Sequence, residues 1–345
     1  MDAEKKQKTG TDSFEKNSSN KNPGEHICGE IRTDYRTGLK SMLIMGRNNR
    51  PKDVNRNDEV KDSGKQKCPF EPEKYDLNKT YFEIGSPWRV RTIYNKYPLL
   101  DYNSEIKNSN NGFFIKSSNF GYSFVIIDTP EHTRKFEDAS EIELKDIAEA
   151  IKKTEKGIFE DEKIKFVYLN KNYGSKSSGS LFHSHLQVLG FMELPMMVSK
   201  RAEASAEYMK KTGRCLIEDA IEFERVRRIK KSKNTVSYAP FAPIYTGESV
   251  IVPKRHVKAL GDLDINELVE LLWQCQRIIK ANNHIFGSIS YNIMGYSFRD
   301  GNDFHSYLEI IPRPDEIGPM QMAGYYGSTI IPEDYSRMVR NLLRK

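Results

Sequence analysis

Two copies of one ordered pattern run through the sequence, and this repeat restricts the fold more than any other feature. Each copy contains two histidines, which are 51 residues apart in the first copy and 49 in the second: His132 and His183, then His256 and His305. An asparagine stands 13 residues before the second histidine of each copy, at positions 170 and 292. Such agreement, in a chain with seven histidines, indicates a duplicated structural unit. The chain is therefore predicted to fold as two similar halves.

Each copy shows the same predicted order of strand, helix and strand. Apolar runs at 122–128, 165–169, 249–252 and 289–292 are typical of strands. Helices are predicted from Ser140 to Lys156 and from Asp264 to Ala281, because apolar residues recur there at intervals of three and four. A last helix is predicted to begin near Pro332. These elements indicate an α+β fold of antiparallel sheets with packed helices, in which a pseudo-twofold relates the halves.

Composition divides the chain into four segments. Residues 1–26 are polar with one aromatic, and they are predicted to be a disordered tail because they bury too little apolar surface to offset ordering entropy. Residues 27–195 form the N-terminal half. Residues 196–232, rich in Lys, Arg and Glu, are predicted to be a helical connector. Residues 233–345 form the C-terminal half with its final helix.

Charge and cysteine content limit the class of protein. The 54 basic and 48 acidic residues are mixed along the chain and give a net charge of +6, so nucleic-acid binding is not expected. The chain has no apolar run of about 18 residues and no basic-then-apolar leader, so neither a membrane span nor a secretory signal is expected. Four cysteines in 345 residues do not predict a disulfide framework. A reducing cytoplasm is the expected location.

The segment that carries chemistry is Gly179-Ser-Leu-Phe-His183-Ser-His185-Leu-Gln187. In an extended strand, the two imidazoles and the carboxamide of this segment would share one face. A neutral imidazole is a nucleophile, and a nearby amide N–H can hold a phosphoryl oxygen on which charge develops. The alternative is a pair of buried structural histidines beside a surface glutamine.

The segments around these histidines resemble the galactose-1-phosphate uridylyltransferase family of the histidine-triad superfamily. The resemblance covers roughly residues 29 to 335 and depends on the order of several motifs, since none is specific alone. The run from Asn172-Tyr-Gly174 through a Gly/Ser turn to His183-Ser-His185-Leu-Gln187 is the main one. The other similar segments are 30–38, 47–51, 68–71, 88–98, 252–256 and 309–313. The resemblance implies tandem histidine-triad-like halves.

The same resemblance implies a double displacement with His185 as nucleophile. His185 would attack the α-phosphorus of a nucleotide sugar and expel sugar 1-phosphate, and an acceptor phosphate would then take the nucleotide. Gln187 would donate to an α-phosphate oxygen, and the nitrogen of His185 that does not attack would be held by a backbone carbonyl near His183. Substrate contacts are implied for Asn95, Tyr97, Asn172, Ser178, Gly179, Ser180, Arg47 and Arg50. The two arginines would meet the acceptor phosphate, and a homodimer could place them across its interface.

The second copy replaces the reactive side chains. His305-Ser-Tyr307-Leu-Glu309 stands where the first copy has His183-Ser-His185-Leu-Gln187. A phenol is a poor nucleophile at neutral pH, and a carboxylate would repel a nucleotide phosphate. The N-terminal half is therefore expected to be catalytic and the C-terminal half to be a scaffold.

The family's zinc site, a Cys-x-x-Cys with two histidines, is altered twice in this chain. The first copy has Cys68 and Glu71 with His132 and His183, and the second has Cys215 and Glu218 with His256 and His305. Glutamate is an acceptable zinc ligand, although two thiolates bind zinc more strongly than one. Two structural zinc sites are predicted; the alternative is two metal-free clusters.

Substrate specificity stays open at this stage. The segment Pro319-Met-Gln-Met-Ala-Gly-Tyr-Tyr326 replaces the acidic, glycine-rich segment expected to hold hexose hydroxyls. Ser184 between the histidines, in place of proline, is similar to ADP-glucose phosphorylases. The favoured function is a UDP-glucose:hexose-1-phosphate uridylyltransferase. The alternatives are a nucleotide-sugar or dinucleotide phosphorylase or hydrolase, and a non-catalytic nucleotide sensor.

Overall fold

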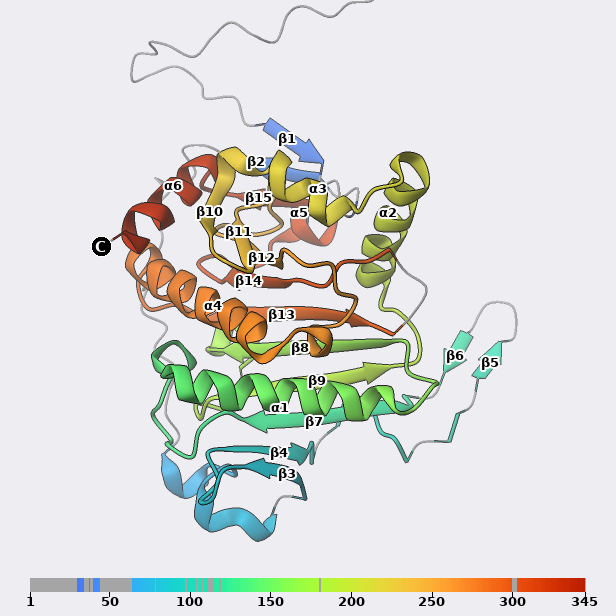
Figure 1. The fold of residues 1–345 in the computed structure, drawn as a ribbon, viewed down its shortest axis with the longest axis vertical. Coiled ribbons are helices and arrows are strands. Elements are labelled where there is room, and N and C mark those ends of the chain that lie inside the picture. Colours follow the sequence, from blue (N-terminus) through green and yellow to red (C-terminus); the bar gives the residue numbers. More distant parts are fainter. Residues whose placement is uncertain are drawn as a thin grey trace, which may run out of the picture.

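One ten-stranded sheet runs through both halves of the chain (Figure 1). The computed structural model describes residues 30–33, 37, 40–43, 64–77, 79–96, 98–103, 105–106, 108–110, 115–117, 119–179, 181–299 and 303–344. The strands, in sheet order, are β10 (Arg228–Lys231), β11 (Thr235–Tyr238), β12 (Ser249–Pro253), β14 (Leu308–Pro312), β13 (Tyr291–Phe298), β8 (Phe166–Tyr173), β9 (His185–Phe191), β7 (Gly121–Ile127), β4 (Val90–Tyr94) and β3 (Thr80–Ile84). All neighbours in this sheet pair antiparallel.

The two copies of the repeat meet at the centre of the sheet. Strand β13 pairs with β8 along its whole length, from Tyr291 opposite Tyr173 to Phe298 opposite Phe166. On one side of this seam lie the strands of the first copy, and on the other lie those of the second. The α+β fold with antiparallel sheet and two similar halves is confirmed, with the difference that the halves share one continuous sheet.

Two long helices cover one face of the sheet, one from each half (Figure 1). These are α1 (Glu141–Phe159) and α4 (Ile265–Phe286), which slightly exceed the predicted ranges. Both begin with a capping box, formed by Ser140 with Glu143 and by Asp264 with Glu267, which satisfies backbone N–H groups at the helix start. Their apolar faces and the inward residues of the sheet form the main hydrophobic core. The predicted C-terminal helix is α6 (Pro332–Leu343).

The opposite face of the sheet is covered by shorter segments. In the first half, Cys68 and Phe70, between the short 3-10 helices η2 (Lys65–Lys67) and η3 (Pro72–Leu77), pack on β4 and β7. In the second half, α2 (Met196–Thr212) and α3 (Leu216–Phe223) contribute to a separate aromatic-rich cluster. These helices occupy most of the predicted connector, whose last residues already form β10. The candidate functional side chains His185 and Gln187 lie on this second face.

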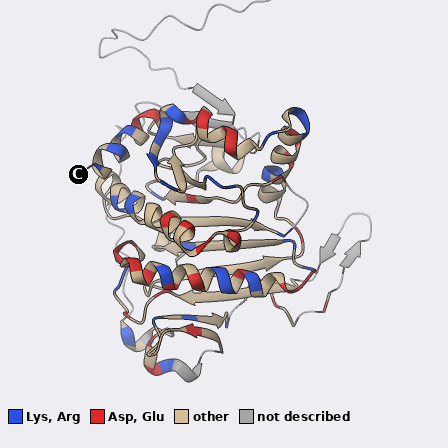
Figure 2. Cartoon of the chain, in the orientation of Figure 1, with Lys and Arg blue, Asp and Glu red and all other residues tan. Residues whose placement is uncertain are grey.

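The remaining elements are small. One three-stranded sheet contains β1 (Glu30–Thr33), β2 (Lys40–Leu43) and β15 (Tyr325–Ser328), and β5 (Asn108–Asn110) pairs with β6 (Ile115–Ser117). A one-turn helix, α5 (Pro319–Met322), precedes β15. Basic and acidic residues alternate along α1 in Figure 2, so this face carries both signs of charge. Among the described residues, none of the helices combines the length and apolar character needed to cross a bilayer.

Candidate active site and metal centres

Strand β9 carries the proposed nucleophile at its first residue. His185 and Gln187 lie two residues apart on this strand and therefore share the face that points away from α1 and α4. Leu186 and Val188 point to the other face and belong to the main core. His183 lies in the bend before β9, so the expectation that one strand carries all three side chains was wrong. From this bend, the Nδ1 of His183 faces Cys68 and Glu71, members of the first predicted metal-ligand set.

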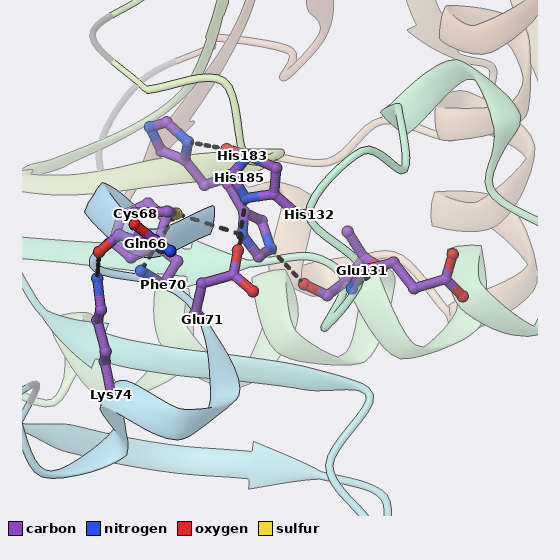
Figure 3. Close-up of polar contacts among 10 residues, drawn as sticks. Gln66, Cys68, Phe70, Glu71, Lys74, Glu131, His132, His183 and His185 are labelled. Carbon is purple, nitrogen blue, oxygen red and sulfur yellow. Dashed lines mark hydrogen bonds and ion pairs between the residues drawn. The ribbon is translucent and has the colours of Figure 1, made fainter. Parts of the chain in front are cut away.

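The orientation of His185 is set by one hydrogen bond. Its Nδ1–H donates to the backbone carbonyl of His183 at 2.8 Å, as Figure 3 shows. This bond selects the tautomer whose Nε2 has a free lone pair. The ring of Phe70 packs edge-on against the imidazole at a centroid distance of 5.2 Å and restricts its rotation. In this tautomer, Nε2 can act as a nucleophile.

Burial keeps this imidazole neutral. Desolvation, and then the nearby charge of Lys171, lowers the pKa of His185 to about 4. At pH 7 the side chain is therefore an uncharged base with an available lone pair.

A buried network that the sequence did not reveal lies directly beneath His185. The Nζ of Lys171 donates to Asp128 Oδ2 at 3.0 Å, to Ser184 Oγ at 2.7 Å and to the His185 carbonyl at 3.1 Å. The Ser184 hydroxyl donates in turn to the same Asp128 oxygen at 2.9 Å. These groups connect β8, the end of β7 and the start of β9, and so fix the backbone that presents the imidazole. A lysine within the otherwise buried strand β8 was the available sequence signal.

Removing the Ser184 hydroxyl should destabilise the protein more than removing its counterpart in the second half. Ser184→Ala takes one partner each from the buried Lys171 and Asp128, so we expect the free energy of unfolding to fall by about 1.5–3 kcal/mol. Ser306, the matched control, donates to the uncharged Tyr296 carbonyl at 2.6 Å, and Ser306→Ala should cost about 0.5–1.5 kcal/mol. Urea unfolding at equilibrium measures both. Equal losses would show that the ion pair adds nothing to the Ser184 bonds.

The first predicted metal-ligand set converges beside His185. Cys68, Glu71, His132 and His183 are all buried, and their ligand atoms lie within 4.8 Å of one another. Figure 3 shows these side chains pointing toward a common centre. The Nε2–H of His183 donates to the Thr129 carbonyl at 2.8 Å, which leaves Nδ1 facing the cluster. That backbone bond is the kind of outer contact that orients a histidine ligand.

The second set converges in the same way but is more open. The ligand atoms of Cys215, Glu218, His256 and His305 also lie within 4.8 Å of one another. Cys215 and His305 are buried, whereas Glu218 is exposed and His256 half-buried. We therefore expect a metal at this second cluster to exchange with solvent more readily than one at the first.

The distances in both clusters suit a tetrahedral ion. Zinc bonds of roughly 2.0–2.3 Å imply distances of about 3.3–3.8 Å between ligand atoms. In the first cluster, Nδ1 of His183 lies 3.5 Å from the Cys68 sulfur and 3.4 Å from Glu71 Oε1. In the second, His256 Nδ1 lies 3.6 Å from Glu218 Oε1, and His305 Nδ1 lies 3.9 Å from the Cys215 sulfur, slightly beyond this range. One direct contact, His132 Nδ1 to Glu71 Oε1 at 2.5 Å, is shorter than this range.

The donor types of the two clusters are those that a divalent ion can take, and a nearby cation would be needed to hold the thiols as thiolates. Burial raises the pKa of both the Cys68 and the Cys215 thiol, which opposes the thiolate form unless a positive charge is nearby. One thiolate and one carboxylate together neutralise a divalent ion. The residues present therefore fit zinc at both clusters.

The other predicted substrate contacts are only partly brought together. Asn172 lies near the end of β8, where its side chain accepts a hydrogen bond from Asn292 at 2.7 Å. The backbone N–H groups of Ser178 and Gly179 donate within their own turn, to Ser175 and Gly174, so in this conformation they do not point to a phosphate. Asn95 follows β4, which is separated from β9 by β7. Tyr97, Ser180, Arg47 and Arg50 lie outside the described residues.

The equivalent position in the second half is filled by an ion pair. Tyr307 and Glu309 are fully buried, and the guanidinium of Arg201 from α2 donates to both, at 2.7 and 2.8 Å. The hydroxyl of Tyr296 also donates to Glu309, at 2.7 Å. A protein side chain thus occupies the position at which the first half would receive a substrate. This supports the prediction that the second half does not react.

Comparison with known proteins identifies the first half. Residues 20–195 match the family described as "Galactose-1-phosphate uridyl transferase, N-terminal domain". The chain is 28% identical to the ADP-glucose phosphorylase of Arabidopsis thaliana over 264 residues, which are 74% of this chain and 75% of that protein. It is 22% identical to the galactose-1-phosphate uridylyltransferase of Thermotoga maritima over 292 residues, covering 80% of this chain and 92% of that one.

Solved structures resemble the whole fold. The crystal structure of an ADP-glucose phosphorylase from Arabidopsis thaliana with bound ADP-glucose aligns with a TM-score of 0.78 and 26% identity, covering 91% of this chain and 99% of that one. A structure of uridylyltransferase aligns with a TM-score of 0.72 and 23% identity, covering 91% and 98%. The second likeness shows the shared fold.

Proposed function

The chain belongs to the galactose-1-phosphate uridyl transferase family, and from this premise we propose that it moves a nucleoside monophosphate from a nucleotide sugar to a phosphate acceptor through His185. The observation that carries the proposal is the bond from His185 Nδ1–H to the His183 carbonyl, because it leaves Nε2 free to attack. The buried, neutral state of the ring at pH 7 supports the same role. Family membership makes the protein an enzyme of the nucleotidyltransferase and phosphorylase type.

The reaction has two balanced steps. The Nε2 lone pair of His185 forms a bond to the α-phosphorus, and the bond from that phosphorus to the sugar 1-phosphate oxygen breaks, so sugar 1-phosphate leaves. An oxygen of the acceptor phosphate then attacks the same phosphorus, the P–N bond breaks, and neutral His185 returns. The His183 carbonyl accepts the Nδ1–H throughout and stabilises the positive charge that the ring carries in the intermediate. Gln187, on the same face of β9, would donate to an α-phosphate oxygen.

Two acceptors distinguish the candidate reactions. With hexose 1-phosphate, the protein would be a UDP-glucose:hexose-1-phosphate uridylyltransferase. With inorganic phosphate, it would be a phosphorylase of a nucleotide sugar. The second candidate is favoured by the similarity to the ADP-glucose phosphorylase. Ser184, which stands between the two histidines in place of proline, agrees with it because His-Ser-His resembles the motif of ADP-glucose phosphorylases.

We also propose that both Cys-Glu-His-His clusters hold structural zinc. His183 is a ligand in the first cluster, and its carbonyl orients His185, so the ion would keep the reactive segment in register. A cytoplasmic location and a homodimer in which Arg47 and Arg50 reach the acceptor phosphate stay predictions from the sequence.

Labelling separates the candidate functions. The protein is incubated with UDP-glucose or ADP-glucose labelled at the α-phosphorus, and acid-labile label on the denatured chain is counted. If UDP-glucose labels the protein and hexose 1-phosphate then releases that label, the result supports the uridylyltransferase. Label from ADP-glucose that inorganic phosphate releases as ADP supports the phosphorylase. Binding of either sugar nucleotide without label would contradict covalent transfer and indicate a sensor.

A further inference from the structure

A row of polar side chains crosses the seam between the halves on the face that carries His185. Asn170 pairs with Gln187, so continuing the β8–β9 register by two residues brings Asn172 opposite His185. Asn292 pairs with Asn172 from the other side, and their side chains are hydrogen bonded. Strands lie about 4.8 Å apart, so the backbone of Asn292 is about 10 Å from that of His185.

Arg313 stands at the end of this row and is held by the second half. It follows β14 directly, and its backbone N–H donates to the Ser290 carbonyl at 2.8 Å. Its Nε donates to the Asn292 side-chain oxygen at 2.7 Å, and its guanidinium lies over the Tyr245 ring at 4.4 Å. Within the described part of the chain, neither terminal guanidinium nitrogen of Arg313 has a hydrogen-bond or ion-pair partner. The group is therefore oriented in advance while two of its donor nitrogens remain available.

The Gly/Ser turn of the first half faces the same space as this guanidinium. Residues 175–178, Arg313 and residues 315–317 line one pocket of about 490 Å³. Gly174 has a φ of +91°, and a Cβ there would meet the Ser290 hydroxyl at 2.1 Å, so only glycine lets the turn approach the second half this closely. The Asn292 amide also donates to the Ser177 carbonyl at 3.0 Å. The same asparagine thus fixes both the turn and Arg313.

The charges of the pocket indicate what it binds. Lys176 and Arg313 are cationic, whereas Asp315 and Glu316 are anionic. A bare polyanion would meet repulsion from the two carboxylates. A sugar phosphate suits both the cationic and the anionic groups, because its phosphate pairs with the guanidinium and its hydroxyls donate to the carboxylates.

We propose that Arg313 binds the phosphate of the sugar 1-phosphate group, first as the distal phosphate of the donor and then as the anion that leaves or enters. The proposal rests on the proposed function and extends it, because it gives the unreactive half a substrate-binding residue. A nucleotide sugar with its α-phosphate at His185 would extend across Asn172 and Asn292 toward Arg313.

Arg313→Met tests the proposal in the full-length, metal-containing protein. We measure the concentration of glucose 1-phosphate that releases label from His185 at half the maximal rate. This concentration should rise about 10- to 100-fold, because the variant loses charge-assisted hydrogen bonds to the phosphate. The affinity for UMP and AMP should change less than about twofold, because a nucleoside monophosphate lacks the distal phosphate. Arg313→Lys should give an intermediate shift, since it retains charge without the guanidinium fork. It also serves as the second variant if Arg313→Met does not fold.

Arg277→Met provides the matched control. Arg277 lies on α4, on the opposite face of the sheet, so this variant changes the net charge equally and should leave the glucose 1-phosphate response unchanged. If both Arg313 variants require the same glucose 1-phosphate concentration for half-maximal label release as the wild type, the proposal is wrong. The proposed function would still stand, because the protein would still take up label. If the wild-type chain takes no label, label release cannot be measured. Binding of the sugar nucleotides, UMP and AMP is then measured by calorimetric titration instead. In that case Arg313→Met should weaken the binding of the sugar nucleotides but not that of UMP or AMP. Equal effects on all of them would show that the proposal is wrong.

Discussion

In the variant His185→Asn, the rate at which label from a nucleotide sugar becomes attached to the protein is expected to fall by at least about 10⁴-fold. Asparagine can still donate to the His183 carbonyl, but it offers no nitrogen lone pair that can form a bond to phosphorus. The amide is also close to the imidazole in size, so the buried site should still fold. Rapid-quench labelling measures the rate, and thermal unfolding checks the fold.

The second half supplies a control at the equivalent position. Tyr307 is as buried as His185, and its hydroxyl accepts a hydrogen bond from Arg201 rather than facing a substrate. Tyr307→Phe should therefore leave the labelling rate within about twofold of the wild type, because it touches no reacting group. Wild-type labelling in His185→Asn would assign the covalent step to another residue.

Disrupting the first proposed zinc cluster is expected to lower both the stability and the labelling rate. Cys68→Ala removes the sulfur ligand of the first proposed zinc site, so this variant should hold about one zinc fewer per chain than the wild type. An ion present at 1,000 times its dissociation constant contributes about 4 kcal/mol to the free energy of unfolding, and a loss of this order is expected. Labelling should fall as well, because His183 holds the carbonyl that orients His185. Elemental analysis, urea unfolding and labelling measure the three effects.

Two further variants make this result specific. Cys275→Ala removes a buried thiol from the α4 core without touching either cluster, and it should retain the wild-type zinc content. Glu71→Cys gives the first cluster a second thiolate and should make it resist a chelator longer than the wild type. A wild-type protein purified without chelators that holds less than about 0.3 zinc per chain would contradict the two-site proposal.

The local pattern of the sequence was sufficient for the two long helices, but less so for the strands. Apolar spacing and capping residues predicted α1 and α4, because both signals act within a few residues along the chain. The start of β13 was misplaced by two residues, and its extension to Phe298 was missed. Alternation is hard to read in a strand whose two faces are both covered. The repeat predicted two halves, but it did not predict that β8 pairs with β13 and so makes one continuous sheet of both.

The sequence by itself determined the composition of the candidate centres. The family resemblance implied both Cys-Glu-His-His sets and their repetition in the two halves supported them; the structure brings each set together. The resemblance predicted the carbonyl that holds His185, and the bond to His183 is present. These features could be read because each residue belongs to a short motif or to a matched pair of motifs.

Only the tertiary structure decided what surrounds these centres. Lys171 meets Asp128 across 43 residues, Arg201 meets Glu309 across 108, and Arg313 reaches the turn of the other half through Asn292. No periodicity or local motif encodes such contacts, because they depend on the register of strands that pair across the seam. A shift of one residue would reverse the face of every side chain in this row, so the register determines which polar groups reach His185.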